Sequence, residues 1–189
     1  MDGHRDAEDE RALVERARAD PAAFADLYRR YLPRVYAFAI RRTGAVEAAE
    51  DVTSAAFERA LRNLGTYRWQ ECGFGPWLFR IVANELADHY RRAGRAASHR
   101  AIGAAQRLAP AEPRDPAEVV GTRDAVAEVL VAMSRLSPRY ERALSLRYLS
   151  GLSTEEAAIA FGTSRATMAV VVHRATRALR RELEREDVS

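Results

Sequence analysis

Residues 153–168 read STEEAAIAFGTSRATM, and this stretch decides the fold of the C-terminal half of the chain. Ser153, with Glu156 three residues later, forms a capping box that starts a short helix. Gly162 then supplies a tight turn, and a longer, arginine-bearing helix follows. The pattern predicts a helix-turn-helix whose second helix presents its N-terminal residues to a DNA major groove. A helical hairpin with no DNA role is the alternative.

The helix after this turn is expected to have an apolar side and a basic side. Its apolar residues recur at helical spacing: Met168, Val172, Ala175, Leu179 and Leu183. Its basic residues are all arginines: Arg174, Arg177, Arg180, Arg181 and Arg185. The arginines favour nucleic-acid binding, whereas glutamates at the far end are typical of a mixed, solvated face.

Helical patterns also precede this motif. Ser137 and Pro138 are a helix cap and a first-turn proline, and Gly151 is expected to stop the helix that they start. In the N-terminal half, apolar stripes cover residues 24–40, 49–64 and 76–90. Strand-like alternation is absent, so the sequence predicts an all-α fold.

Two breaks interrupt the N-terminal stripes. Pro33 is expected to kink or split the first stripe, which ends near Gly44, and residues 65–75 form a loop rich in glycine and aromatic residues. After Arg92 the stripes stop, and Pro110, Pro113 and Pro116 predict a linker between two domains.

The composition fits a globular protein of 189 residues with 48% apolar and 30% charged residues. Every one of the 30 basic residues is arginine, yet the net charge is only +3, so the distribution of charge matters more than its sum. Arginine offers a planar fork for phosphates and guanine edges.

The sequence also argues against several classes of protein. One cysteine, Cys72, and four scattered histidines predict no disulfide framework, metal site or cofactor; a redox role for Cys72 is the less favoured reading. The sequence contains no paired carboxylates, no nucleophile with a base and no phosphate-binding glycine loop. We therefore expect neither an enzyme nor a small-molecule substrate. The acidic N-terminus is not expected to be a signal peptide, and no apolar run is long enough to cross a bilayer, so we expect a cytoplasmic protein without membrane insertion.

Four stretches, in order, resemble one protein family. Residues 77–92 read WLFRIVANELADHYRR and are similar to the promoter-melting helix of extracytoplasmic-function (ECF) sigma factors of the sigma-70 family. The other three are EDVTSAAFERAL at 50–61, RYLSGLSTEEAA at 147–158, and GTSRAT at 162–167 followed by HRA. The resemblance runs from about Phe24 to Leu183 and implies a factor that binds core RNA polymerase and directs it to promoters.

The resemblance also implies a division of the chain. It predicts an acidic segment at 1–20, a sigma2-like helical bundle (region 2) at 21–95, a flexible linker at 96–121, and a sigma4-like helix-turn-helix domain (region 4) at 122–189. The implied partners are core RNA polymerase, promoter DNA and an anti-sigma factor.

Functional residues are implied at matching positions. Core polymerase would be bound through Glu50, Asp51, Phe57 and Glu58, with core packing as the alternative for Phe57. The single-stranded −10 element would be held through Tyr67, Arg80, Asn84, His89, Arg91 and Arg92. Trp77 and Leu78 are expected in the core, and Asp88 as a partner of a neighbouring arginine.

The duplex −35 element would be read through Ser164, Arg165, Thr167, His173, Arg174 and Arg177. Two departures from the family stand out. Ser54-Ala55 replaces a common Gln-Glu pair, and Ala169-Val170-Val171 replaces a polar and basic stretch. Because the run 168–172 cannot all face one core, we expect Val170 and Val171 to form a surface for an anti-sigma factor or for thymine methyls. Promoter affinity would then depend more on the first domain than is usual.

Two other functions are compatible with parts of the sequence. A stand-alone helix-turn-helix regulator that binds operator DNA as a dimer would explain the second domain but not the first. A purely helical interaction module would predict no salt-dependent DNA binding.

Overall fold

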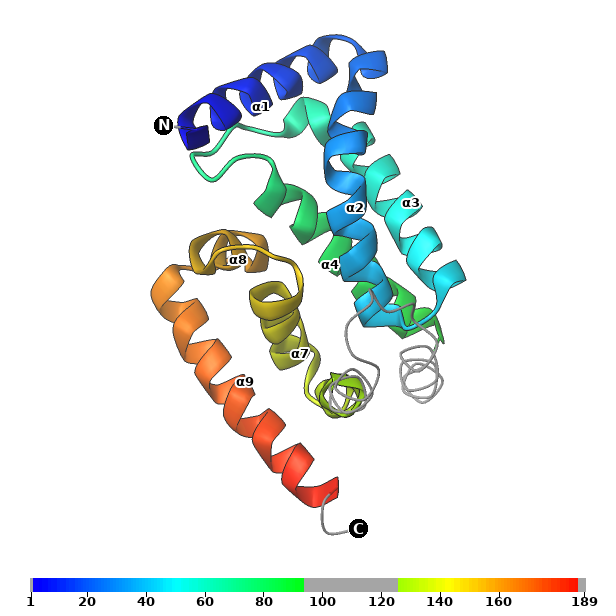
Figure 1. The fold of residues 1–189 in the computed structure, drawn as a ribbon, viewed down its shortest axis with the longest axis vertical. Coiled ribbons are helices and arrows are strands. Elements are labelled where there is room, and N and C mark those ends of the chain that lie inside the picture. Colours follow the sequence, from blue (N-terminus) through cyan, green and yellow to red (C-terminus); the bar gives the residue numbers. More distant parts are fainter. Residues whose placement is uncertain (1, 94–125, 187–189) are drawn as a thin grey trace, which may run out of the picture.

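A computed structural model describes residues 2–93 and 126–186, and within these ranges every regular element is helical (Figure 1). The all-α fold predicted from the sequence is thereby confirmed. We call residues 2–93 the N-terminal unit and residues 126–186 the C-terminal unit. The expected linker, 96–121, lies outside the described residues.

The N-terminal unit contains four α-helices and two short 3-10 turns. They are α1 (Asp2–Ala19), η1 (Pro21–Ala23), α2 (Phe24–Thr43), α3 (Val46–Asn63), η2 (Leu64–Thr66) and α4 (Gly75–Ala93). The acidic N-terminal segment is therefore a helix. Pro33 does not split α2, and Gly44 ends this helix in the left-handed conformation, with φ +66°.

The core of this unit lies where α2, α3 and α4 meet. The apolar stripes expected from the sequence face it, and its largest fully buried side chains include Leu27, Phe38, Phe74, Leu78 and Phe79. The alanines of α3 let its backbone come close to α2. Helix α1 crosses the end of this bundle, above the loop that leads into α4 (Figure 1).

The C-terminal unit begins with a helix at 126–134. It continues with α7 (Pro138–Leu144), the π-helical turn η3 (Ser145–Leu149), α8 (Thr154–Phe161) and α9 (Arg165–Glu186). The predicted capping box is present, because the Glu156 N–H donates to Ser153 Oγ at 3.2 Å and the Ser153 N–H donates to Glu156 Oε2 at 2.7 Å. Gly162 makes the turn between α8 and α9, with φ +88°.

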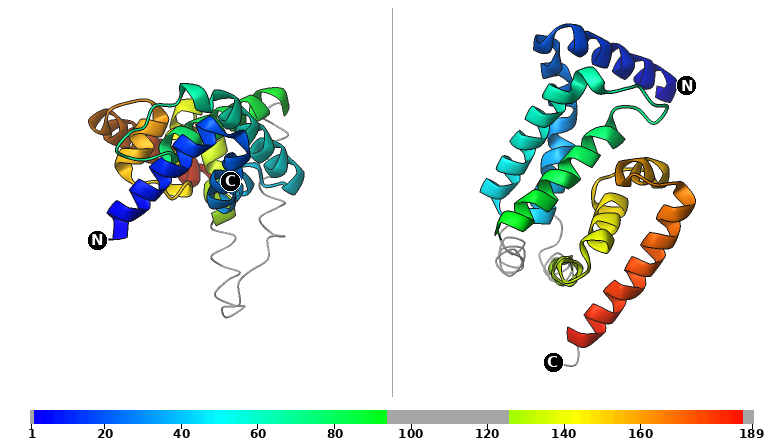
Figure 2. Two further views of the ribbon diagram at one scale, coloured as in Figure 1. Left: turned by 90° about the horizontal axis from the view of Figure 1, so that it is seen from above. Right: turned by 180° about the vertical axis from the view of Figure 1, so that it is seen from behind.

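The two units pack against each other through α4 and α8 (Figure 2). One buried apolar cluster contains residues of both units, among them Phe79 and Leu86 of α4 and Ala157 and Ala160 of α8. A smaller cluster around Leu130 fills the C-terminal unit alone. No helix in the described ranges is long and apolar enough to cross a bilayer.

Candidate nucleic-acid interface

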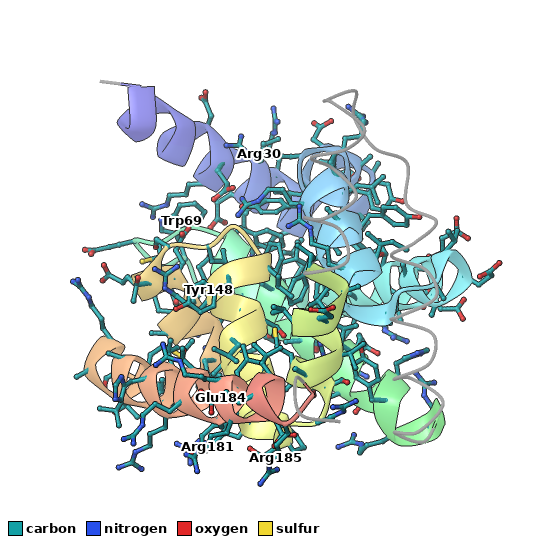
Figure 3. All side chains as sticks on the ribbon, turned by 60° about the horizontal axis from the view of Figure 1, so that its bottom comes forward. Arg30, Trp69, Tyr148, Arg181, Glu184 and Arg185 are labelled. Carbon is teal, nitrogen blue, oxygen red and sulfur yellow. The ribbon has the colours of Figure 1, made fainter. Side chains whose placement is uncertain are left out.

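The outer face of α9 gathers the residues expected to bind duplex DNA. All six are exposed: Ser164, Arg165, Thr167, His173, Arg174 and Arg177. The hydroxyl of Ser164 accepts the Thr167 N–H at 3.2 Å and so caps the start of α9. Further along the same helix, Arg181 and Arg185 extend outward (Figure 3). The first turns and the basic side of α9 are therefore open to a large polyanion.

The apolar run in α9 divides between the core and the surface. Met168 is fully buried and Val171 is only 4% exposed, whereas Val170 is 50% exposed. Met168, Val171 and Ala175 follow the i, i+3, i+7 spacing of one helix face, which explains their common burial. The predicted surface patch of Val170 and Val171 is therefore wrong, because only Val170 reaches the surface.

A larger apolar surface of the C-terminal unit lies on its other side. Here an apolar groove runs between the helix at 126–134, η3 and α9, and Val126, Val129, Met133 and Tyr148 line it. Tyr148 is 59% exposed.

The loop before α4 is built on an aromatic cluster. The ring centroid of Tyr67 lies 5.5 Å from that of Phe74, 5.0 Å from that of Trp77 and 6.5 Å from that of Trp69. The Tyr67 hydroxyl donates to the Gly73 carbonyl at 2.9 Å, and burial raises the pKa of Tyr67 to about 12. Tyr67 is thus a buried support of the loop, while Trp69 and Trp77 are only half-buried.

Glu10 of α1 fixes the same loop and was missed from the sequence. Its carboxylate is nearly buried and accepts the Tyr31 hydroxyl at 2.5 Å and the Phe74 N–H at 3.0 Å. Arg30 Nε lies 3.6 Å from it. Burial, followed by the charge of Glu10, holds the pKa of Tyr31 well above its usual range. The sequence gives no sign that Glu10 fixes the loop, because nothing distinguishes it from the other acidic residues of its segment.

The polar edge of α4 is divided into two parts. Arg91 and Arg92 are exposed at its C-terminal end, where Arg91 pairs with Asp88 and Arg92 Nε donates to the Asp88 carbonyl at 3.4 Å. The expected surface pairing of Asp88 with its arginine neighbours is thereby confirmed. This end of α4 is a basic surface open to phosphates.

The other part of the α4 edge faces the C-terminal unit. The Arg80 guanidinium donates to the carbonyl of Ile159, and Asn84 Oδ1 accepts Arg142 Nη1 at 2.9 Å. The structure thus places Arg80 and Asn84 together, one turn apart, but both are engaged by α7 and α8.

His89 lies near α3 in a groove that is also lined by Asp51, Glu58 and Arg92. Burial and then the charge of Arg92 lower the pKa of His89, whereas Asp51 acts in the opposite direction. His89 is therefore suited to a hydrogen bond or a ring contact as a neutral side chain near pH 7.

The exposed edge of α3 carries the predicted acidic residues. Glu50, Asp51 and Glu58 are exposed, and Phe57 is buried. The Phe57 ring lies 4.6 Å from the ring of Tyr28, which is 38% exposed. The structure supports core packing for Phe57, and Tyr28, which packs against it, is partly exposed.

Comparisons with known proteins match each of the two units to a family model. The family model Sigma-70 region 2 matches residues 27–96, and the model Sigma-70, region 4 matches residues 127–179. The ECF RNA polymerase sigma factor BldN of Streptomyces coelicolor is 38% identical over 90% of this chain, which spans 64% of that relative, less than two thirds of its length. The ECF RNA polymerase sigma factor SigM of Bacillus subtilis is 30% identical, with 82% of this chain and 91% of the relative covered.

Among solved structures, the fold is similar to that of the sigma factor RpoE in a complex with the anti-sigma factor NepR from Bartonella quintana. The TM-score is 0.59 and the identity 24%, with 85% of this chain and 96% of the other covered.

Proposed function

Because the chain belongs to the ECF sigma factors of the sigma-70 family, we propose that it binds core RNA polymerase and directs transcription initiation at specific promoters. One observation carries this proposal. The two family models match in order on the two units, and each unit has its own basic surface, at the end of α4 and along α9. A protein that contacts two separate promoter elements needs this arrangement.

The division of labour follows the two units. We assign core-polymerase and −10 binding to region 2, at 21–95, and −35 binding to region 4, at 122–189. The segment 96–121 is the tether between them, and the segment 1–20, which contains α1, precedes region 2.

The −35 element is assigned to α9. An α-helix fits the major groove of duplex DNA, and bidentate contacts of arginine to guanine are among the commonest base-specific contacts. The exposed arginines of this helix, Arg165, Arg174 and Arg177, supply such contacts or bind phosphates, while Ser164, Thr167 and His173 contribute hydroxyl and imidazole groups. Val170 is the apolar side chain that can contact a thymine methyl.

The −10 element is assigned to α4 and the loop before it. Single-stranded DNA is held by cations along its backbone and by aromatic or amide groups around its bases. Arg80, Arg91 and Arg92 supply the cations, Asn84 and His89 supply polar edges, and Tyr67 supports the loop. The half-buried Trp69 offers the aromatic face that the buried Tyr67 does not.

Core polymerase is assigned to the outer edge of α3. Glu50, Asp51 and Glu58 give this edge a negative charge that suits a basic partner helix. The exposed ring of Tyr28, supported from below by Phe57, adds an apolar anchor at its side.

The remaining assignments rest on the family and its relatives. An anti-sigma factor is a proposed partner, because a protein of similar fold forms such a complex. The relatives are sigma factors, and we propose that this chain likewise performs no catalysis of its own and acts in the cytoplasm. A stand-alone operator-binding dimer is not favoured, since it leaves the region 2 match at 27–96 unexplained.

Binding to core polymerase tests the proposal directly. The purified chain is expected to co-elute with core RNA polymerase in size-exclusion chromatography. Glu58→Lys should weaken this association at least about tenfold, or ~1.4 kcal/mol, by placing a positive charge against a basic partner. Glu184→Lys is the matched control, because Glu184 is an exposed acid on α9 and does not belong to the α3 edge. Failure to co-elute would overturn the proposal, and equal effects of the two variants would remove the assignment of α3.

A further inference from the structure

We propose that Glu10 of α1 is a positioning residue for the −10 element: its carboxylate fixes the loop before α4 in one conformation, and the base selectivity of that loop depends on it. The inference rests on the proposed function of α4 and its loop. It goes beyond that function because α1 precedes the residues, 27–96, that the region 2 model matches. We call residues 67–74 the aromatic loop.

The aromatic loop needs support from outside itself. It joins η2 to α4 without helical backbone, and a turn near its end is closed by the Gly73 N–H, which donates to the Gln70 carbonyl at 2.9 Å. The tip of the loop carries the exposed side chains of Arg68, Gln70 and Glu71. Side chains on a loop keep one geometry only when neighbouring groups hold the loop in place.

Glu10 supplies such support from α1, which crosses the loop (Figure 1). Its Oε2 accepts the backbone N–H of Phe74 at 3.0 Å, and its Oε1 accepts the hydroxyl of Tyr31 at 2.5 Å. We call these two hydrogen bonds the Glu10 tether. Hydrogen bonds to an ionised carboxylate are stronger than neutral ones, and Glu10 is only 7% exposed, so water competes weakly for it. The end of the aromatic loop is therefore fixed to both α1 and α2.

Two glycines let the partners of the tether approach the backbone around Phe74. A Cβ on Gly73 would lie 2.5 Å from Glu10 Oε2, and one on Gly75 would lie 3.3 Å from the Tyr31 hydroxyl oxygen. The Phe74 side chain is fully buried, with its ring centroid 5.5 Å from that of Tyr31. Close approach of another group to the backbone is one of the uses of glycine. The tether is thus part of the packed interior and differs from a surface ion pair.

A chain of contacts links the tether to the exposed part of the loop. Tyr67 donates its hydroxyl to the Gly73 carbonyl at 2.9 Å, and its ring centroid lies 5.5 Å from that of Phe74. The same ring lies 6.5 Å from the ring of Trp69, which is partly exposed. Loss of the Glu10 carboxylate would free Phe74 first, and Tyr67 and Trp69 pack on from there.

The position of Trp69 matters because of the side chains beside it. Arg68 and Gln70 flank this ring, and side chains of these two types form hydrogen bonds with base edges. Stacking and phosphate contacts tolerate every base, whereas a hydrogen bond to a base edge requires a fixed geometry. A loosened loop would therefore keep much of its affinity and lose its preference for one base.

Global instability would have a different effect. It lowers the folded fraction of the chain, and the apparent affinity for every sequence then falls by the same factor. The ratio of affinities for two bases at one position stays constant. Base preference is thus a readout that a merely structural role of Glu10 would not move.

A selection from random-sequence single-stranded DNA measures this preference. Holoenzyme is assembled from core RNA polymerase and the purified chain, and the bound oligonucleotides are sequenced. Trp69→Ala identifies the positions at which the loop contributes, because it removes the ring at the tip. At these positions we expect Glu10→Ala to lower the preference for the favoured base about three- to tenfold, the cost of ordering the loop on binding. At all other positions the preference should match that of the parent chain.

Ala49→Gly is the control for loss of stability. Ala49 is fully buried at the end of α3 that lies away from the loop, and glycine in a helix destabilises it. This variant should weaken binding without altering the preference at any position. Circular dichroism checks that each variant keeps its helices at the temperature of the selection.

Two conservative variants separate the reach of Glu10 from its charge. In Glu10→Gln, the amide oxygen can still accept the Phe74 N–H, and the amide nitrogen can donate to the Tyr31 hydroxyl oxygen. Its base preference should stay close to that of the parent chain. Glu10→Asp keeps the charge but is one methylene shorter, so it should lose as much preference as Glu10→Ala. The opposite order would show that charge matters rather than reach, and would overturn the positioning role.

The tryptophans report the conformation of the loop directly. With fluorotryptophan incorporated into the free chain, Trp69 and Trp77 give separate fluorine NMR resonances, and Trp69→Phe assigns them. We expect the Trp69 resonance to broaden or split in Glu10→Ala and Glu10→Asp. It should stay sharp in Glu10→Gln and Ala49→Gly.

The outcomes distinguish this inference from the proposed function. An unchanged base preference in Glu10→Ala, or the same change in Ala49→Gly, would overturn the inference and leave the proposed function standing. A holoenzyme that selects no sequence with the parent chain would instead overturn the proposed function, on which the inference depends.

Discussion

Glu10 Oε2 accepts the backbone N–H of Phe74 at 3.0 Å, which ties the N-terminal helix to the loop that leads into α4. The same carboxylate accepts the hydroxyl of Tyr31, so one side chain joins α1, α2 and the loop. A buried carboxylate with two donors and a nearby arginine is a strong local constraint. The orientation of the aromatic loop therefore depends on a residue that is 64 positions away in sequence.

Replacement of Glu10 should loosen this junction. Glu10→Ala would leave the Tyr31 hydroxyl and the Phe74 N–H buried and unpaired, and we expect a loss of about 2–4 kcal/mol in the free energy of unfolding. Glu15→Ala is the control, because Glu15 is exposed and pairs with Arg18 across one turn. Urea unfolding followed by circular dichroism measures both. Similar values for the two variants would show that Glu10 has no such role.

Replacement of Gly73 by a residue with a side chain is expected to destabilise the fold for two separate reasons. Its φ is +76°, and a Cβ built there would lie 2.5 Å from Glu10 Oε2. Gly73→Ala should therefore destabilise the chain by more than the ~1 kcal/mol cost of the left-handed conformation alone. In a Glu10→Ala background the steric part disappears, so the cost of Gly73→Ala should fall toward that figure. Additive effects in this double-mutant cycle would contradict the contact.

The same substitution at two adjacent valines of α9 should affect stability very differently. Val171→Asp would place a carboxylate in the core and is expected to cost about 3–5 kcal/mol of stability. Val170→Asp should change stability by no more than about 0.5 kcal/mol, because this side chain is half exposed. The same substitution should nevertheless weaken binding to duplex promoter DNA, since it adds a negative charge to the proposed DNA face. Thermal unfolding and fluorescence anisotropy separate the two effects.

His89 makes stability depend on pH in a defined direction. Its pKa is lowered in the folded chain, by burial first and by Arg92 second, whereas the unfolded value is 6.5. The unfolded chain therefore binds more protons below about pH 6.5, and the folded chain loses stability as the pH falls from there to the folded pKa. Above that pH the contribution is constant. His89→Gln should lose less stability than the parent chain between about pH 7.5 and 5.5 in urea unfolding, and an equal loss would contradict the shift.

The helices and caps could be predicted from the sequence because their signals are local. Ser153, Glu156 and Gly162 act within one turn of their own positions, and each has the predicted role. Exposure of the α9 residues also followed from spacing. Helical spacing could not decide the role of Phe57, because core packing and partner binding both require an apolar aromatic residue.

Contacts that join distant segments could not be predicted in this way. Nothing near Glu10 distinguishes it from the other acids of its segment, and its burial arises only when α1 crosses the loop. Arg42 with Glu141, and Asn84 with Arg142, belong to helices on either side of the linker, so no periodicity relates them. The error at Val171 has a different origin, because a continuous apolar run hides which residues share a helix face.

Start-site selection in a run-off assay tests the central claim most directly. Core RNA polymerase, supplied with the purified chain and a library of genomic fragments, should produce transcripts from a limited set of promoters that share two sequence elements. Arg174→Ala should lower this activity, while core polymerase alone should give no defined start sites. Transcripts whose start sites are the same with and without the chain would contradict the account.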